Sequence, residues 1–193
     1  MSRALLIVDV QNDFTEGGAL GVEGGAAVAS GITELLQQHR GDYDLVIASR
    51  DWHDADNDNG GHFATGEPDF VDTWPVHCVA GTPGADYHPA LQADAIDVHI
   101  RKGMGRPAYS MFEGVDETGR EVEAVLDGAG ITDVDVVGIA TDHCVRASAL
   151  DALKAGLRVR VLTDLVAGVA PASSGAALTE LAAAGAELAP APH

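Results

Sequence analysis

The 193-residue sequence has few basic residues. Its 11 lysines and arginines stand against 30 aspartates and glutamates, which gives a formal net charge of −19. Nucleic acids and anionic membrane surfaces attract proteins through lysine and arginine, so we expect neither as a partner. Solubility or an acidic host proteome would explain the excess negative charge, and the sequence does not decide between them.

Long apolar runs are absent too, and cysteine is scarce. No stretch approaches the roughly 20 apolar residues that a membrane-spanning helix needs. The first apolar run, ALLIVDV, contains Asp9 and lacks the organisation of a signal peptide. We therefore expect a cytoplasmic protein whose two cysteines, Cys78 and Cys144, remain reduced. The sequence leaves the oligomeric state open, a homo-oligomer included.

Short β-rich apolar runs alternate with helical patterns along the chain. We expect strands at 4–10, 45–50, 97–101, 134–140, 158–164 and 186–189. Helical patterns lie between most of them, at 25–40, 119–130, 143–156 and 173–185. This alternation predicts a parallel sheet covered by helices on both faces. The length predicts one α/β domain, 1–193, with three layers and a six-stranded parallel sheet.

One segment interrupts the alternation. Residues 51–84 follow the second expected strand, are rich in glycine, proline and aspartate, and show little regular pattern. A compact domain seldom carries so long an irregular loop unless the loop has a function. In open parallel sheets, ligands bind beyond the carboxyl ends of the strands. Four chemically capable residues fall at or just after such ends and should converge on one edge: Asp9, Asp51, Lys102 and Cys144.

Cys144 lies where an expected strand passes into a helical pattern, in GIATDHCVRASALDALKAG. The amino end of a helix stabilises a thiolate, and its free N–H groups can hold an oxyanion. A nearby lysine also favours the thiolate. Asp9, Lys102 and Cys144 would thus supply a proton carrier, an activator and a nucleophile. The residues alone leave open that Cys144 is a small buried apolar residue and that Asp9 and Lys102 form a plain ion pair.

Histidines are concentrated in the irregular loop. RDWHDADNDNGGHF contains Asp51, His53 and His62, and WPVHC contains His77. One carboxylate and three imidazoles suit zinc, iron or manganese. We therefore expect one divalent transition metal and a metal-binding loop at about 51–84. Cys78 is either an additional ligand or a bystander.

Several longer motifs carry a resemblance over essentially the whole chain. They are LLIVDVQNDF, SRDWH, GHF, WPVHCVAGTPGADYHP, KG, YSMFEG and GIATDHCVRASALDA. Together they resemble the isochorismatase-like cysteine hydrolases and, within them, the nicotinamidases, more closely than the metal-free isochorismatases.

The resemblance implies an activity and a role for each matching residue. The activity is hydrolysis of nicotinamide to nicotinate and ammonia in NAD salvage, with pyrazinamide as a further substrate, through a cysteine thioester. The implied catalytic residues are Asp9, Lys102 and Cys144, and the implied metal ligands, which anchor the pyridine nitrogen, are Asp51, His53, His62 and His77. The ring pocket falls on Phe14, Trp74, Tyr109 and His143, and the oxyanion hole falls on the amides of Ala140, which follows a cis peptide, and Cys144.

Two other interpretations remain at this point. An amidohydrolase of the same family acting on a ureido or carbamoyl substrate would need no pyridine anchor, so the metal set and Trp74 argue against it. A non-catalytic binding protein on the same fold would not need to keep Asp9, Lys102 and Cys144 together.

Overall fold

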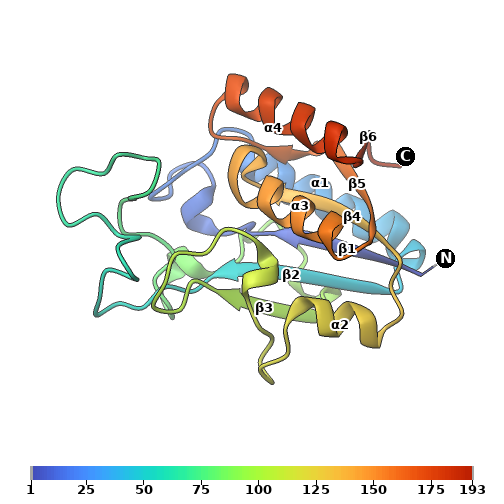
Figure 1. Cartoon of the computed structure of the whole chain (residues 1–193), viewed down its shortest axis with the longest axis horizontal. Helices are drawn as coiled ribbons and strands as arrows, with labels where there is room; N and C mark the ends of the chain where they lie inside the picture. The colour runs from blue at the N-terminus through green and yellow to red at the C-terminus, as the bar shows by residue number, and fades with distance from the viewer. Residues whose placement is uncertain (1, 193) are drawn as a thin grey trace.

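Six parallel strands form the centre of the protein, and the computed structural model describes residues 2–192 (Figure 1). The strand order is β3-β2-β1-β4-β5-β6. The strands are β1 (Arg3–Val8), β2 (Leu45–Asp51), β3 (Val98–Lys102), β4 (Asp133–Ile139), β5 (Arg158–Ala167) and β6 (Glu187–Ala189). The predicted six-stranded parallel sheet is therefore confirmed.

Helices cover both faces of this sheet. Helix α1 (Gly25–His39) packs on one face, because its apolar residues Val28, Ile32 and Leu35 recur at helical spacing and form one stripe. The other face is covered by α2 (Val122–Gly128), α3 (Arg146–Lys154) and α4 (Pro171–Ala184). Figure 1 shows α3 in front of the sheet and α1 behind it. No helix within residues 2–192 combines the length and apolar character needed to cross a membrane.

The strand order reverses between β1 and β4. The chain proceeds from β1 to β2 on one side and from β4 to β5 on the other. Such a reversal opens a crevice at the carboxyl ends of the two strands. Asp9 follows β1 and Cys144 lies shortly after β4, so both predicted catalytic residues stand at this crevice.

The segment between β2 and β3 forms the predicted irregular loop. No α-helix or strand occurs in it, within the described part of the chain, and isolated bridges join His53 to Val79 and Phe63 to Trp74. Figure 1 shows this blue-green segment extending beyond the carboxyl ends of the strands. Its backbone is therefore folded back over the crevice by a few long-range contacts rather than by regular structure.

Candidate active site

The side chain of Lys102 joins three parts of the candidate site. Its Nζ lies 2.8 Å from Asp9 Oδ2, forms a short ion pair with Asp51 Oδ1, and lies 3.8 Å from Cys144 Sγ. All four residues are buried. Burial alone would lower the pKa of Lys102, but the charges of Asp51 and Asp9 outweigh it and hold the pKa well above its usual value. Lys102 is therefore a fixed positive charge between two carboxylates and a thiol.

Asp9 is held by the neighbouring strand β2. Its φ of +47° lies in the left-handed region, where a residue other than glycine stores about 1–3 kcal/mol of strain. Its N–H donates to Ser49 O at 3.2 Å, and Ser49 Oγ donates to Asp9 Oδ1 at 2.7 Å. These bonds to Ser49 leave Oδ2 to contact Lys102.

The two carboxylates at Lys102 have opposite pKa shifts. Burial raises the pKa of Asp9, and Lys102 offsets only part of that rise. Burial acts on Asp51 as well, but Lys102 and the imidazoles of His53 and His77 outweigh it and hold the pKa well below its usual value. Asp9 is thus suited to accept a proton, whereas Asp51 is suited to remain an anion beside a metal.

Cys144 lies in a wide turn before α3. Residues Thr141–Val145 form a single π-helical turn, in which Val145 N–H donates to Ala140 O at 3.1 Å. The predicted helix at 143–156 is wrong at its start, since α3 begins at Arg146. The apolar spacing of the sequence does not distinguish a π turn from a first α-helical turn. Such turns are often found at functional sites.

The environment of the Cys144 thiol opposes its ionisation. Burial raises the pKa of Cys144 well above its usual value, Lys102 lowers it, and the charges of Asp9 and Asp51 raise it further. The lysine effect therefore has the predicted sign, but burial and the two carboxylates outweigh it. A protonated thiol needs a nearby base before it can attack, and Asp9 has the properties of such a base.

Ala140 and Cys144 carry the amides of the predicted oxyanion hole. The Ile139–Ala140 peptide bond is cis, as the family resemblance implied. Both Ala140 and Cys144 line the cavity above the thiol. The Ala140 N–H donates no hydrogen bond to any residue in the described range 2–192. It is thus available to an oxygen that becomes negative during a reaction.

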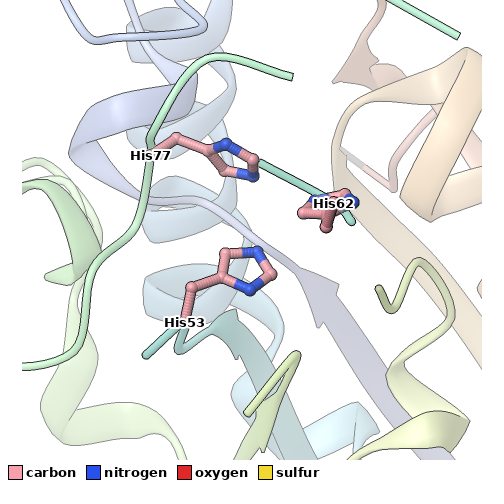
Figure 2. Close-up of side chains that lie close together, drawn as sticks. All are labelled: His53, His62 and His77. Atoms are coloured by element: carbon pink, nitrogen blue, oxygen red, sulfur yellow. The ribbon is translucent and has the colours of Figure 1, made fainter. Parts of the chain in front are cut away.

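Three imidazoles from the irregular loop lie together (Figure 2). The potential ligand atoms of His53, His62 and His77 lie within 4.8 Å of one another, and all three residues are buried. Asp51 Oδ2 is 3.4 Å from His53 Nε2 and 3.6 Å from His77 Nε2. The structure thus brings all four predicted ligands together. One carboxylate oxygen of Asp51 contacts Lys102, and the other lies beside the imidazoles.

Hydrogen bonds of the histidines prepare nitrogen lone pairs for a cation. His53 Nδ1 donates to Gly103 O at 2.8 Å, and His77 Nδ1 donates to Pro75 O at 2.7 Å. Because a carbonyl oxygen can only accept, both rings carry a proton on Nδ1, and Nε2 is the nitrogen that could bind a cation.

The chemistry of the donor set fits a divalent transition metal. His53 Nε2 and His62 Nδ1 are buried and have no hydrogen-bond partner among residues 2–192. Burial, with His53 and His77, lowers the pKa of His62 to about 4, so His62 is neutral at pH 7. Neutral imidazoles and one carboxylate are ligands for zinc, iron or manganese. Cys78 lies outside this group, with its Sγ 3.9 Å from Gly84 O.

A buried glutamine, absent from the predicted site, holds the main chain of Asp51. Gln11 Nε2 donates to Asp51 O and to Ala85 O, both at 2.9 Å, and Gln11 Oε1 accepts from Asp51 N–H at 2.8 Å. The signal was present, since Gln11 belongs to the LLIVDVQNDF motif. Nothing in that motif indicates which residue the Gln11 side chain holds in place.

Gly103 and Asn59 also support the metal-binding loop, and the sequence analysis did not predict either of them. Gly103 has a φ of +79°, and a Cβ there would lie 2.5 Å from His53 Cε1. Asn59 Oδ1 accepts from Asp54 N–H at 2.8 Å and from Gly105 N–H at 3.1 Å, which ties the loop to the segment after β3. The sequence gives no period or motif from which the role of Asn59 follows.

A cavity of about 400 Å³ opens above the thiol and the imidazoles. All four predicted ring-pocket residues line it: Phe14, Trp74, Tyr109 and His143. The proposed catalytic and metal-binding residues on its walls are Asp51, His62, His77 and Cys144. Its walls also include apolar residues that the sequence did not indicate, namely Leu20, Val22, Phe70 and Val169. Trp74 Nε1 donates to the Tyr109 hydroxyl at 3.0 Å. Trp74 also meets the His143 ring edge-to-face, with the ring centroids 5.2 Å apart. These contacts fix an aromatic wall beside the metal cluster, since the ring centroids of Tyr109 and His62 are 5.8 Å apart.

A buried thiol, a carboxylate base and an uncommitted amide beside a metal cluster are the parts of a cysteine hydrolase with an adjacent metal centre. The comparison with known families agrees with this class. Residues 3–192 match the isochorismatase domain family, and the chain belongs to that family.

Relatives with known names cover nearly the whole chain. The nicotinamidase/pyrazinamidase of Mycobacterium tuberculosis is 53% identical over 96% of this chain and 97% of its own. The pyrazinamidase of Pyrococcus horikoshii in complex with zinc superposes with a TM-score of 0.83 at 36% identity, covering 98% of this chain and 99% of its own. PnC1 of L. infantum in complex with nicotinate gives the same TM-score and identity, covering 98% and 92%.

Proposed function

We propose that the protein hydrolyses nicotinamide to nicotinate and ammonia, and pyrazinamide in the same way. The observation that carries the proposal is the position of Lys102, which contacts Asp9 and Asp51 and lies 3.8 Å from Cys144 Sγ. This one lysine connects a nucleophile and a base to the metal cluster. The names of the relatives, a nicotinamidase/pyrazinamidase and a protein bound to nicotinate, support the same substrate.

In the acylation half of the reaction, Cys144 Sγ attacks the carboxamide carbon as Asp9 takes the thiol proton. The carbonyl oxygen becomes negative and accepts hydrogen bonds from the Ala140 and Cys144 amides. The C–N bond then breaks, and Asp9 returns its proton to the leaving nitrogen, which departs as ammonia. A thioester at Cys144 remains. Lys102 stays protonated throughout and stabilises the charged forms of Asp9 and Cys144.

In the deacylation half, Asp9 takes a proton from water as the water oxygen attacks the thioester carbon. The C–S bond breaks, Asp9 passes its proton to the sulfur, and the acid product leaves as nicotinate after losing its carboxyl proton to solvent. The raised pKa of Asp9 suits both halves, because the residue must accept a proton and donate it again near neutral pH.

The metal site has a separate part in this proposal. The four residues Asp51, His53, His62 and His77 would hold the ion, which supplies a Lewis-acid position for the pyridine nitrogen. Phe14, Trp74, Tyr109 and His143 then confine the ring, with its carboxamide directed to Cys144. An aliphatic ureido or carbamoyl substrate would use neither the metal nor this aromatic wall.

The reaction is tested by ammonia release from nicotinamide and from benzamide, which carries the same carboxamide on a ring without nitrogen. Loss of one coordinated donor is worth several kcal/mol, and each 1.36 kcal/mol is about tenfold in rate. We expect kcat/KM for benzamide to be at least about a hundredfold lower with metal-loaded protein, and the gap to shrink after chelation. Equal cleavage of both substrates by the metal-loaded protein would show that the ring nitrogen is not recognised.

The setting of the reaction follows from its product. Nicotinate is a precursor for pyridine nucleotides, so we propose a role in NAD salvage. Both cysteines are free in the structure, as predicted. The cytoplasmic location and the oligomeric state stay predictions.

A further inference from the structure

A second cavity, of about 360 Å³, lies where β2 and β3 form the edge of the sheet. It shares no lining residue with the cavity above Cys144. The residues that matter here are Arg50, Arg101, His99, Tyr87, Asp94 and Glu117. The proposed reaction uses none of them.

The register of the two strands places two arginines side by side. Arg50 pairs with Arg101, and the next pair is Asp51 with Lys102. Because side chains alternate along a strand, the two arginines are directed to the opposite face of the sheet from the catalytic pair. Like charges directly opposite one another destabilise a sheet. A negative charge beside Arg50 and Arg101 would therefore stabilise this pair.

Neither arginine receives that charge from the protein. Arg106 aside, every other lysine and arginine has a carboxylate oxygen within 4.0 Å. Arg50 and Arg101 have no such partner anywhere in residues 2–192, although acidic residues outnumber basic ones by 30 to 11. Asp94 and Glu117 line the same cavity, but their carboxylates lie beyond that distance.

Aromatic rings hold both guanidinium groups in place. Arg50 Cζ is 4.8 Å from the Trp52 ring centroid and 4.5 Å from that of Tyr87, and Arg101 Cζ is 4.5 Å from that of Trp52. Arg50 Nε is buried with no acceptor in the described chain. Burial lowers the pKa of His99, and the charges of Arg50 and Arg101 lower it further against the opposing charge of Glu117. The cavity thus holds two guanidinium groups in fixed positions, with no carboxylate oxygen within 4.0 Å of either in the described chain.

We propose that this cavity binds the phosphate group of a small ligand between Arg50 and Arg101. Arginine forks bind phosphate oxygens in pairs, and a dianion neutralises two guanidinium groups where a monocarboxylate neutralises one. The volume admits inorganic phosphate or the phosphate of a nucleoside monophosphate. The proposal is independent of the proposed function, because the two cavities have separate walls.

The test uses the two tryptophans of the full-length, metal-loaded protein as local reporters. Sodium phosphate is titrated at constant ionic strength, and the indole N–H signals are followed by NMR. Trp52 lies under both arginines and should shift saturably, whereas Trp74 lines the other cavity and should not. Acetate should bind at least about tenfold more weakly than phosphate. AMP, as a third probe, shows which phosphate compound the cavity takes. Tighter binding of AMP than of phosphate would indicate that the ligand is a nucleotide, and equal binding would indicate that it is free phosphate.

Variants locate the site. Arg50→Gln and Arg101→Gln should each weaken phosphate binding at least about tenfold. Arg106→Gln, which removes another arginine without a carboxylate partner, is the matched control and should bind phosphate as the wild type does. The proposal is overturned if Trp52 shows no saturable shift, if Trp74 shifts instead, if acetate binds as tightly as phosphate, or if Arg101→Gln binds as tightly as wild type.

Discussion

The carboxyl ends of β1 and β2 each deliver one buried aspartate to the same lysine, yet the two aspartates differ in chemistry. At the end of β1, Asp9 meets Lys102 and a serine, and its pKa is raised. At the end of β2, Asp51 meets the same lysine and two imidazoles, and its pKa is lowered. One shared cation therefore does not decide the state of a carboxylate; the remaining neighbours do. The site uses this difference to separate a proton carrier from a metal ligand.

The largest effect should come from removing the nucleophile on the Asp9 side. Cys144→Ala should lower kcat at least about a thousandfold, because no other group can form the acyl intermediate. Metal content, measured by elemental analysis, should remain that of the wild type. Cys78→Ala, which removes the other buried thiol, serves as the control and should stay active. Near wild-type turnover by Cys144→Ala would contradict this assignment, because the reactive group would then belong to the Asp51 side.

A smaller effect should follow from disturbing only the Asp51 side. Gly103→Ala places a Cβ against the His53 ring and should weaken metal affinity about 10–100-fold, as loss of a supporting contact to a ligand does. Gly119→Ala is the matched control, because Gly119 has a φ of +84° but open space around its Cβ position. Dialysis against a graded series of chelator would measure both variants. Equal metal loss in the two would mean that backbone strain, not the contact with His53, is responsible.

The smallest effect concerns the state of the Cys144 thiol. Asp9 raises the pKa of Cys144 and Lys102 lowers it. Asp9→Asn should therefore shift the pH profile of iodoacetamide labelling to lower pH, and Lys102→Ala should shift it to higher pH. Labelling can be followed by mass spectrometry of the intact protein. Asp127→Asn, an exposed change on α2, is the control and should leave the profile unchanged. An unchanged profile in Asp9→Asn would show that Asp9 does not affect the pKa of the Cys144 thiol.

Much of the site follows from simple features of the sequence. Apolar runs place Asp9, Asp51 and Lys102 at strand ends, and parallel strands end on one edge, so their convergence was predictable. The histidines of the irregular loop were recognisable as a ligand set because, together with Asp51, they form a donor set that suits a transition metal.

Other features depend on distances that no local pattern encodes. The opposite pKa shifts of Asp9 and Asp51 arise from which neighbours each meets after folding. The hydrogen bonds of Gln11 reach residues 40 and 74 positions away. The pairing of Arg50 with Arg101 depends on the β2–β3 register, which a chain with a long irregular connection does not reveal in advance.

Metal content and kcat, measured in parallel for Asp9→Asn and Asp51→Asn, would show whether Asp9 carries the proton and Asp51 binds the metal. We expect Asp9→Asn to keep wild-type metal content and to lose turnover at least about a hundredfold, as removal of a general base does. We expect Asp51→Asn to lose the metal while Cys144 still reacts with iodoacetamide. Metal loss in both variants alike, or near wild-type turnover in Asp9→Asn, would contradict these roles.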